Sequence, residues 1–418
     1  MQDTQPTADD IQVVAEEDVA VAESEEVIFE QSPQIARVLD PPDELERLPA
    51  CPHVFRHPIR AAGWFLGTIY GIFCLWVLLA ITAAIPIVNL LALGYLLEVE
   101  GRLVRTGKLR DAFPLLAHAR RLGSIVFGIW LFLLPLRILA GASAEASVIE
   151  AGGPSDLLFR VLTPLASVLV AMHLLSALAR GGSPGCFLRP VKNVRWLWTR
   201  VRGGGYWMDA GDQIRQFVAE LRLRHHFSLG ARGFVCTLVW LVPPTALFAA
   251  LTQTGPAGPA LMAVSGGLIL SFVLAWLPFL QARFAAENRF RAMFELRTIR
   301  RSFAKSPLVW LLAVIATYAL SFPLYLLKIA LPPDEAMWLV TLIFIAAIYP
   351  ARIVTGWAFH RASTRENRAW FAWRWAIRMP LGALLIAYVF LLYFTPFIGE
   401  QGRGVLIDHH ALLLPVPF

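Results

Sequence analysis

The sequence predicts an all-α protein, a polytopic transmembrane helix bundle of about nine spans that form two parallel four-helix repeats and a C-terminal span. Three observations predict this fold. The 418-residue chain is 57% hydrophobic and 16% charged, whereas a soluble domain has about 25% charged residues. Apolar runs of about 20 residues, each enough to cross about 30 Å of hydrocarbon as a helix, recur along the chain. Lysine and arginine gather in the connections on one side of these runs.

The apolar runs lie at 63–84, 85–100, 122–142, 157–179, 233–252, 260–281, 307–328, 336–359 and 379–398. Backbone polar groups find no water in hydrocarbon, so runs of this length cross as helices. The second run is short, because Pro86 breaks the helix after Ile85 and the apolar residues end at Glu98. A run of that length is also typical of a re-entrant or interfacial segment.

Charge favours a full crossing by this short run. If it crosses, the connections 101–121, 180–232, 282–306 and 360–378 share one side and hold 28 of the 37 Lys and Arg residues. Arg403 is then the only basic residue on the opposite side. The positive-inside rule therefore predicts a plasma (inner) membrane protein with a cytoplasmic N-terminus and an outer C-terminus.

The chain divides into five regions by composition. These are an acidic disordered cytoplasmic tail and Pro-rich linker (1–60), a first four-helix membrane unit (61–180), a basic amphipathic cytoplasmic loop (181–232), a second four-helix unit (233–360), and a basic loop, last span and short outer tail (361–418). Residues 1–50 contain 14 acidic residues, too polar to offset their ordering entropy. A solvated tail and a protein-binding motif are the two interpretations of this segment.

An internal repeat agrees with the two membrane units. A shift of 181 residues places Arg102 on Arg283, and the same shift aligns Arg110 with Arg291 and Phe113 with Phe294. Each unit then consists of a hairpin, a basic amphipathic helix and a second hairpin. Four crossings per unit give both units the same orientation, so the predicted repeat is parallel.

The stretch from Ile85 to Tyr95, with Pro86 and a Gly-Tyr pair, is followed by Gly101-Arg102 and by Gly107-Lys108-Leu109. It resembles a family of bacterial multi-pass membrane proteins of unknown function. The resemblance covers about residues 60–140, with a diverged copy at about 260–330 that has Gly267 in place of the proline. The resemblance implies no activity.

Ionisable residues at membrane depth are candidates for function. Arg137, Arg160 and Lys328 are expected near the outer ends of their helices, where they would contact an anionic substrate or lipid headgroup. The alternative is snorkelling with local ion pairs to acidic residues such as Asp156. Arg352 lies close enough to the inner face to snorkel as well.

Three glycines, Gly63, Gly67 and Gly71, share one face of the first span. Small residues at this spacing let two helices approach closely in lipid. Packing within the molecule and homodimerisation are the two interpretations.

The 181–232 loop contains an apolar stripe of Val191, Val194, Leu197, Trp198 and Val201 among basic residues. Such a helix is typical of one that lies on an anionic leaflet. The stripe is more apolar than a phosphate-tracking groove requires, so we expect contact with the lipid bilayer and its anionic headgroups and none with nucleic acid.

The sequence contains no metalloprotease, dinucleotide, Walker or nucleophile-elbow motif. The four cysteines are too dispersed for a metal site. We therefore expect no enzyme activity and no cofactor. The leading hypothesis is a membrane-organising or partner-binding protein, with a possible partner at the acidic tail. The alternative is a transporter or flippase for an anionic or amphipathic solute.

Overall fold

The structure, a computed structural model, describes residues 48–204, 206–252, 257–329, 333, 337–398, 406, 409 and 411–416. The regular elements in these ranges are all helical, which confirms the predicted all-α fold. The acidic tail before residue 48 lies outside the described residues. The long helices are α2 (Pro58–Ala84), α3 (Asn89–Thr106), α4 (Leu116–Ile149), α5 (Pro154–Ala179), α9 (Leu223–Phe248), α10 (Gly258–Glu287), α12 (Pro307–Ile329), α13 (Met337–Ser363) and α14 (Phe371–Ile398).

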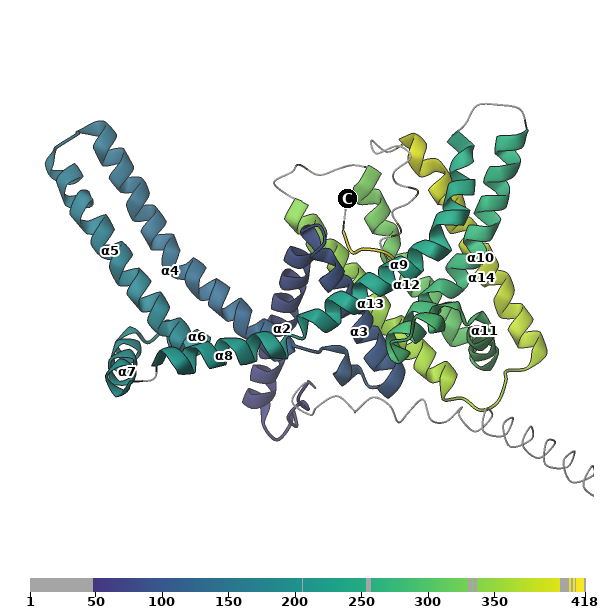
Figure 1. The fold of residues 1–418 in the computed structure, drawn as a ribbon, viewed down its shortest axis with the longest axis horizontal. Coiled ribbons are helices and arrows are strands. Elements are labelled where there is room, and N and C mark those ends of the chain that lie inside the picture. Colours follow the sequence, from purple (N-terminus) through teal and green to yellow (C-terminus); the bar gives the residue numbers. More distant parts are fainter. Residues whose placement is uncertain are drawn as a thin grey trace, which may run out of the picture. The chain divides into compact units, whose positions relative to one another are not determined.

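Shorter helices connect the long ones. These are α6 (Pro184–Phe187), α7 (Pro190–Gly203), α8 (Tyr206–Glu220), α11 (Leu296–Lys305) and the 3-10 helices η3 (Leu109–Ala112), η4 (Ala249–Thr252) and η5 (Phe290–Phe294). Figure 1 shows α7, α8, α11 and the α13–α14 connection at the lower end of the helices, and the α4–α5 tip at the opposite end. The basic connections therefore gather at one end.

Within the described ranges, 8 helical segments are long and apolar enough to cross a membrane. They are α2, α4, α5, the last residues of α8 with α9, α10, α12, α13 and α14. The chain is thus a multi-pass membrane protein, as predicted. The expected span at 85–100 is not among these segments.

The short second run, for which a full crossing and a re-entrant or interfacial segment were both considered, forms a central helix. Pro86 falls in a turn where Ile87 adopts a left-handed conformation with φ of 70°, and α3 begins at Asn89. The 18 residues of α3 contain four charged side chains, and every residue from Ala92 to Leu103 is buried. Mean hydropathy does not identify α3 as a span, because the helix contains these charged side chains. They are compatible with its position because protein rather than lipid surrounds the helix.

Glycines bring α3 into backbone contact with α9. A Cβ atom on Gly94 would lie 1.7 Å from the carbonyl oxygen of His226, and one on Gly230 would lie 1.9 Å from that of Leu90. Gly101 meets the backbone of α10 at Ala285 in the same way. Small residues permit this approach where lipid supplies no hydrophobic drive between helices.

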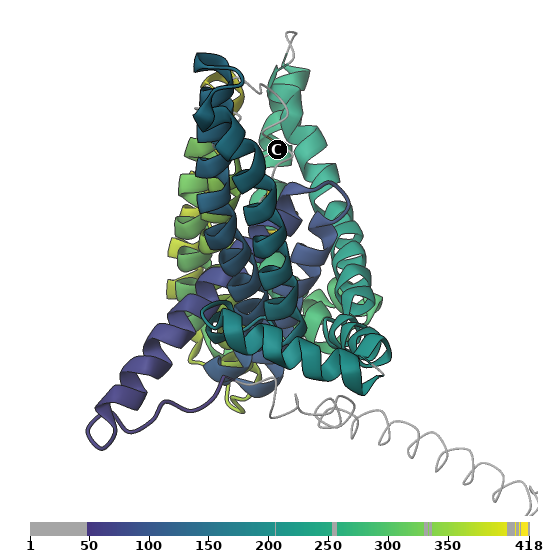
Figure 2. The same cartoon turned by 90° about the vertical axis from the view of Figure 1, so that its left-hand side faces the viewer.

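The two stretches expected as separate four-helix units share their apolar core. One cluster joins Leu75 and Leu96 to Phe344 and Ile348, and a larger one joins Leu93 to much of the region after 229. α3 provides the connection, since it packs against α9, α10 and α13. By contrast, α4 and α5 form a hairpin that extends away from the other helices in Figure 1 and lies in front of them in Figure 2.

The ends of α3 and α10 are built alike. α3 is capped by Gly107 with φ of 66°, and α10 is capped by Asn288 with φ of 53°. A short 3-10 helix follows each cap, η3 after the first and η5 after the second. Gly107 and Asn288 are separated by the 181-residue shift of the sequence repeat. Asparagine tolerates the left-handed conformation, and Arg232 Nη2 donates to Asn288 Oδ1 at 2.7 Å.

The described residues of the C-terminal segment, which was expected to be a short outer tail, pack against the helices. Its described residues include Leu406, His409, Leu412 and Val416, all of them buried. Leu412 belongs to the larger apolar cluster and Val416 to the cluster around α2, α3 and α13. The described residues up to Val416 therefore pack between the helices, as Figure 1 shows for this segment.

Candidate functional site

A polar cluster lies around Glu98 on the buried central helix. Arg102 Nε donates to Glu98 Oε1 at 2.8 Å, and Arg105 Nη2 donates to the same oxygen at 3.3 Å. His225 Nε2, from the start of α9, lies 3.2 Å from Glu98 Oε2. The i, i+4 spacing of Glu98 and Arg102 brings these two side chains to one face of the helix.

A second polar chain links α3 to α13, α10 and the C-terminal segment. Arg352 Nη1 donates to Glu100 Oε2 at 2.9 Å and to Gln281 Oε1 at 2.7 Å. Gln281 Nε2 donates to Thr237 Oγ1 at 2.6 Å and to the carbonyl oxygen of Leu412 at 2.5 Å. Glu100 and Gln281, which the repeat shift aligns, are both 0% exposed. We name Glu100, Gln281 and Arg352 the central triad.

A third group fixes the corner after α10. Arg283 Nε lies 2.9 Å from Glu287 Oε1, and Arg283 Nη2 lies 2.5 Å from Glu295 Oε2. Glu287 also pairs with Arg289. Opposite charges within reach of one another compensate the desolvation of this corner.

The Glu and Arg side chains of these three groups form ion pairs with one another. Glu100 Oε1 and Arg352 Nε are buried and have no hydrogen-bond partner, so the central triad leaves part of its polar capacity unused. In the described part of the chain, His, Cys, Asp and Glu side chains do not form a group of three that could hold a metal ion. The arrangement can stabilise the helix packing or change partners when helices move.

Helix α7 presents an unpartnered apolar stripe. Val191, Val194, Trp198 and Val201 are 80%, 51%, 60% and 56% exposed. On another face of α7, the buried Asn193 anchors the helix to the preceding segment. Its side chain accepts from Arg180 Nη1 at 2.7 Å and donates to the carbonyl oxygen of Cys186 at 2.7 Å. The stripe therefore faces away from the protein because Asn193 sets the rotation of the helix.

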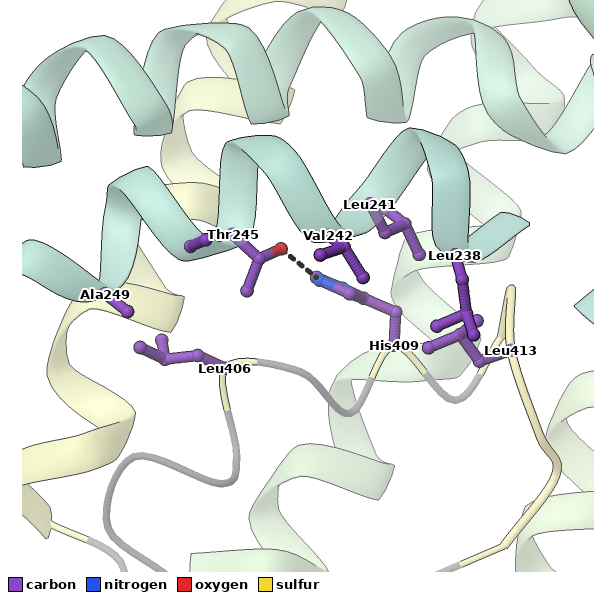
Figure 3. Close-up of a pocket in the computed structure, with 9 residues that line it drawn as sticks. Leu238, Leu241, Val242, Thr245, Ala249, Leu406, His409 and Leu413 are labelled. Carbon is purple, nitrogen blue, oxygen red and sulfur yellow. Dashed lines mark hydrogen bonds between the residues drawn. The ribbon is translucent and has the colours of Figure 1, made fainter. Parts of the chain in front are cut away.

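The C-terminal segment also borders a pocket of about 180 Å³ beside α9. Figure 3 shows Leu406, His409 and Leu413 facing Val242 and Thr245. His409 Nε2 lies 3.5 Å from Thr245 Oγ1. Burial lowers the pKa of His409 to about 4, so the imidazole is neutral at pH 7 and fits its apolar surroundings.

Residues 201–332 match DUF4013, a protein family of unknown function. Comparison with curated proteins and with solved structures gives no match. The match agrees with the predicted resemblance to an uncharacterised family.

The DUF4013 match runs from the end of α7 to the end of α12. It includes Gly230, Gln281 and Arg283, and it covers the stretch 260–330. It does not include 60–140, where the resemblance was predicted, and the prediction that 260–330 is a diverged second copy of that stretch stays a prediction. Arg352 and the C-terminal segment lie beyond the DUF4013 match.

The structure separates the basic residues predicted as headgroup contacts. Arg137 is exposed on α4. Arg160 pairs with Asp156 at 2.9 Å, with 63% of the arginine side chain exposed. Lys328 lies in α12, at the end of the DUF4013 match, and its side chain is outside the described residues. Arg160 thus has the local partner that the snorkelling alternative requires.

The glycine face of α2 points partly toward α4. A Cβ atom on Gly71 would lie 3.2 Å from Leu116, and one on Gly67 would lie 3.5 Å from Arg120. Gly63 has open space around it. Two of the three glycines therefore lie beside a helix of the same molecule.

Sequence reasoning missed the central triad. Arg352 was expected to snorkel, and that expectation is wrong, because the residue is 3% exposed and paired with Glu100. An arginine inside an apolar span and two glutamates at the end of another run are the signal that could have linked them, since intramembrane charges commonly pair. Gln281, within the DUF4013 match, gives no such signal.

Proposed function

We propose that this protein is a non-enzymatic inner-membrane component that organises the membrane or binds partners, with α7 lying on the anionic headgroups of the cytoplasmic leaflet. The exposed apolar stripe of α7 is the observation that carries this proposal. A helix with an apolar stripe and a basic remainder lies in the plane of the membrane interface.

The position of α7 supports this orientation. It begins at Pro190, soon after α5 ends at Ala179, and therefore starts close to the membrane surface. Lys192, Arg195 and Arg200 are exposed along it, and the guanidinium of Arg202 lies 4.4 Å from the Trp198 ring. Each basic residue near an anionic surface contributes about 1 kcal/mol.

Spin labels on α7 test the proposal. We expect a nitroxide at Val194 (V194C) in the full-length protein, reconstituted in phosphatidylglycerol-containing liposomes, to be protected from an aqueous relaxation agent and accessible to oxygen. Thr199 is exposed on another face of α7, so a label at T199C is the matched control and should remain accessible to the aqueous agent. Equal aqueous accessibility of the two labels would refute the proposal.

A transporter for an anionic or amphipathic solute is the second candidate. The observation that favours it is the central triad, a polar chain inside the helices that ends on the backbone of the C-terminal segment. A polar path through the protein would open if that segment moved away.

A liposome flux screen separates the two functions. Under the leading proposal, we expect anion and lipid-analogue flux equal to that of empty liposomes, both for the full chain and for a chain ending at residue 405. Flux that is increased by the truncation and abolished by Arg352→Met would support the transporter and contradict the leading proposal. Arg215→Met, at a pair with Asp212 whose two side chains are exposed, is the control substitution.

A further inference from the structure

An apolar groove lies between α2, α3, α4 and the start of α9. Its volume is about 170 Å³, comparable with the cavity of about 150 Å³ that binds benzene in another protein. The walls are mainly leucine side chains, including Leu75, Leu78, Leu91, Leu115 and Leu122. An aliphatic chain would match these walls, whereas a polar solute would lose its hydration there.

The groove also has a polar side. His226 lines it, is only 5% exposed, and has a buried Nδ1 atom without a hydrogen-bond partner. Tyr95, also in the lining, is already satisfied, because its hydroxyl donates to the carbonyl oxygen of Pro114 at 2.6 Å. His226 therefore offers an unused polar atom beside an apolar space.

The rim of the groove is basic. Leu221 and Leu223 line the groove, and the exposed Arg222 lies between them in the chain. His118, another lining residue, lies 2.7 Å from Glu220 Oε2. Arg121, one turn after it, has its guanidinium 5.6 Å from the Phe217 ring. Glu220 is paired with His118, and Glu98, near His226, is paired with Arg102 and Arg105. The rim therefore complements a negative headgroup.

We propose that this groove is a specific binding site for an anionic phospholipid, with an acyl chain between α2 and α4 and the phosphate at His226 and the basic rim. The inference is independent of α7, because no residue of that helix lines the groove. The bilayer supplies such a ligand at high local concentration to a multi-pass membrane protein.

Native mass spectrometry of the full-length protein tests the proposal. After equilibration with equal amounts of phosphatidylglycerol and phosphatidylcholine, we expect one phosphatidylglycerol to be retained preferentially. Leu78→Trp fills the groove and should lower that retention about tenfold, equivalent to 1.4 kcal/mol. Ile81 lies on the same helix and is 54% exposed, so Ile81→Trp is the matched control and should retain the lipid.

Two further measurements keep the result interpretable. His226→Phe preserves the bulk at the groove but removes the nitrogen, and it should reduce the preference for phosphatidylglycerol over phosphatidylcholine. In the unaltered protein, a photoactivatable phosphatidylglycerol should crosslink to peptides of α2 and the start of α4. Equal retention of both lipids by the unaltered protein, or crosslinks only outside these helices, would overturn the proposal.

Discussion

Gly94→Ala is expected to lower the free energy of unfolding by about 3 kcal/mol, the upper end of the range of about 1–3 kcal/mol that overpacking typically costs. The added Cβ atom would lie 1.7 Å from the carbonyl oxygen of His226. Backbone cannot rotate away as a flexible side chain can, so α3 and α9 must separate. Chemical unfolding in detergent micelles, followed by circular dichroism, measures the change.

Gly63→Ala is the matched control for this substitution. Gly63 also lies within a long helix, and a Cβ atom there would meet nothing within 4 Å. Alanine favours helix over glycine by about 1 kcal/mol, so this variant should be as stable as the unaltered protein or more so. If both variants unfold at the same denaturant concentration, the close α3–α9 contact does not exist in solution.

Arg352→Met is expected to lower the free energy of unfolding by about 3–5 kcal/mol, the cost of leaving a buried charge without its partner. Glu100 is 0% exposed and Arg352 is 3% exposed, so water cannot take the place of the lost guanidinium. Gln281 would also lose the donor that its side-chain oxygen accepts from. The same unfolding measurement detects the loss.

A double variant separates charge pairing from simple packing. Glu100→Leu combined with Arg352→Met removes both charges, and it should recover most of the stability that either single substitution loses. Arg215→Ala is the control for an exposed ion pair, since the Arg215 and Asp212 side chains are 84% and 75% exposed, and it should cost about 0–1 kcal/mol. Additive losses in the double variant would show that Glu100 and Arg352 are not coupled.

The sequence predicted the membrane helices well, because crossing a bilayer depends on local properties. About 20 apolar residues suffice to identify a span, and eight of the predicted runs coincide with helices that meet this criterion. The exposed apolar stripe of α7 follows from helical periodicity in the same way, since Val191, Val194 and Trp198 share a face whatever surrounds them. These predictions need no knowledge of distant neighbours.

The interior was harder to predict, because its residues are far apart in the chain. The central triad joins positions 100, 281 and 352, and its chemistry arises only when three helices meet. Arg137 and Arg160, chosen by depth alone, lie exposed on the α4–α5 hairpin. Depth along a helix is readable from sequence, but the direction in which a side chain faces depends on the neighbouring helices.

The short run at 85–100, with its charged end, has one property that the sequence predicted and one that only the tertiary structure decided. Charge in the flanking connections indicated that the chain returns to the basic side after Pro86, and α3 does run back beside α2 (Figure 1). Only the tertiary structure showed that α3 is enclosed by α9, α10 and α13. The reason is physical. The side of the membrane on which a connection lies follows from local charge and hydropathy. The burial of Glu98 and Glu100 requires partners that only packing brings within hydrogen-bonding distance.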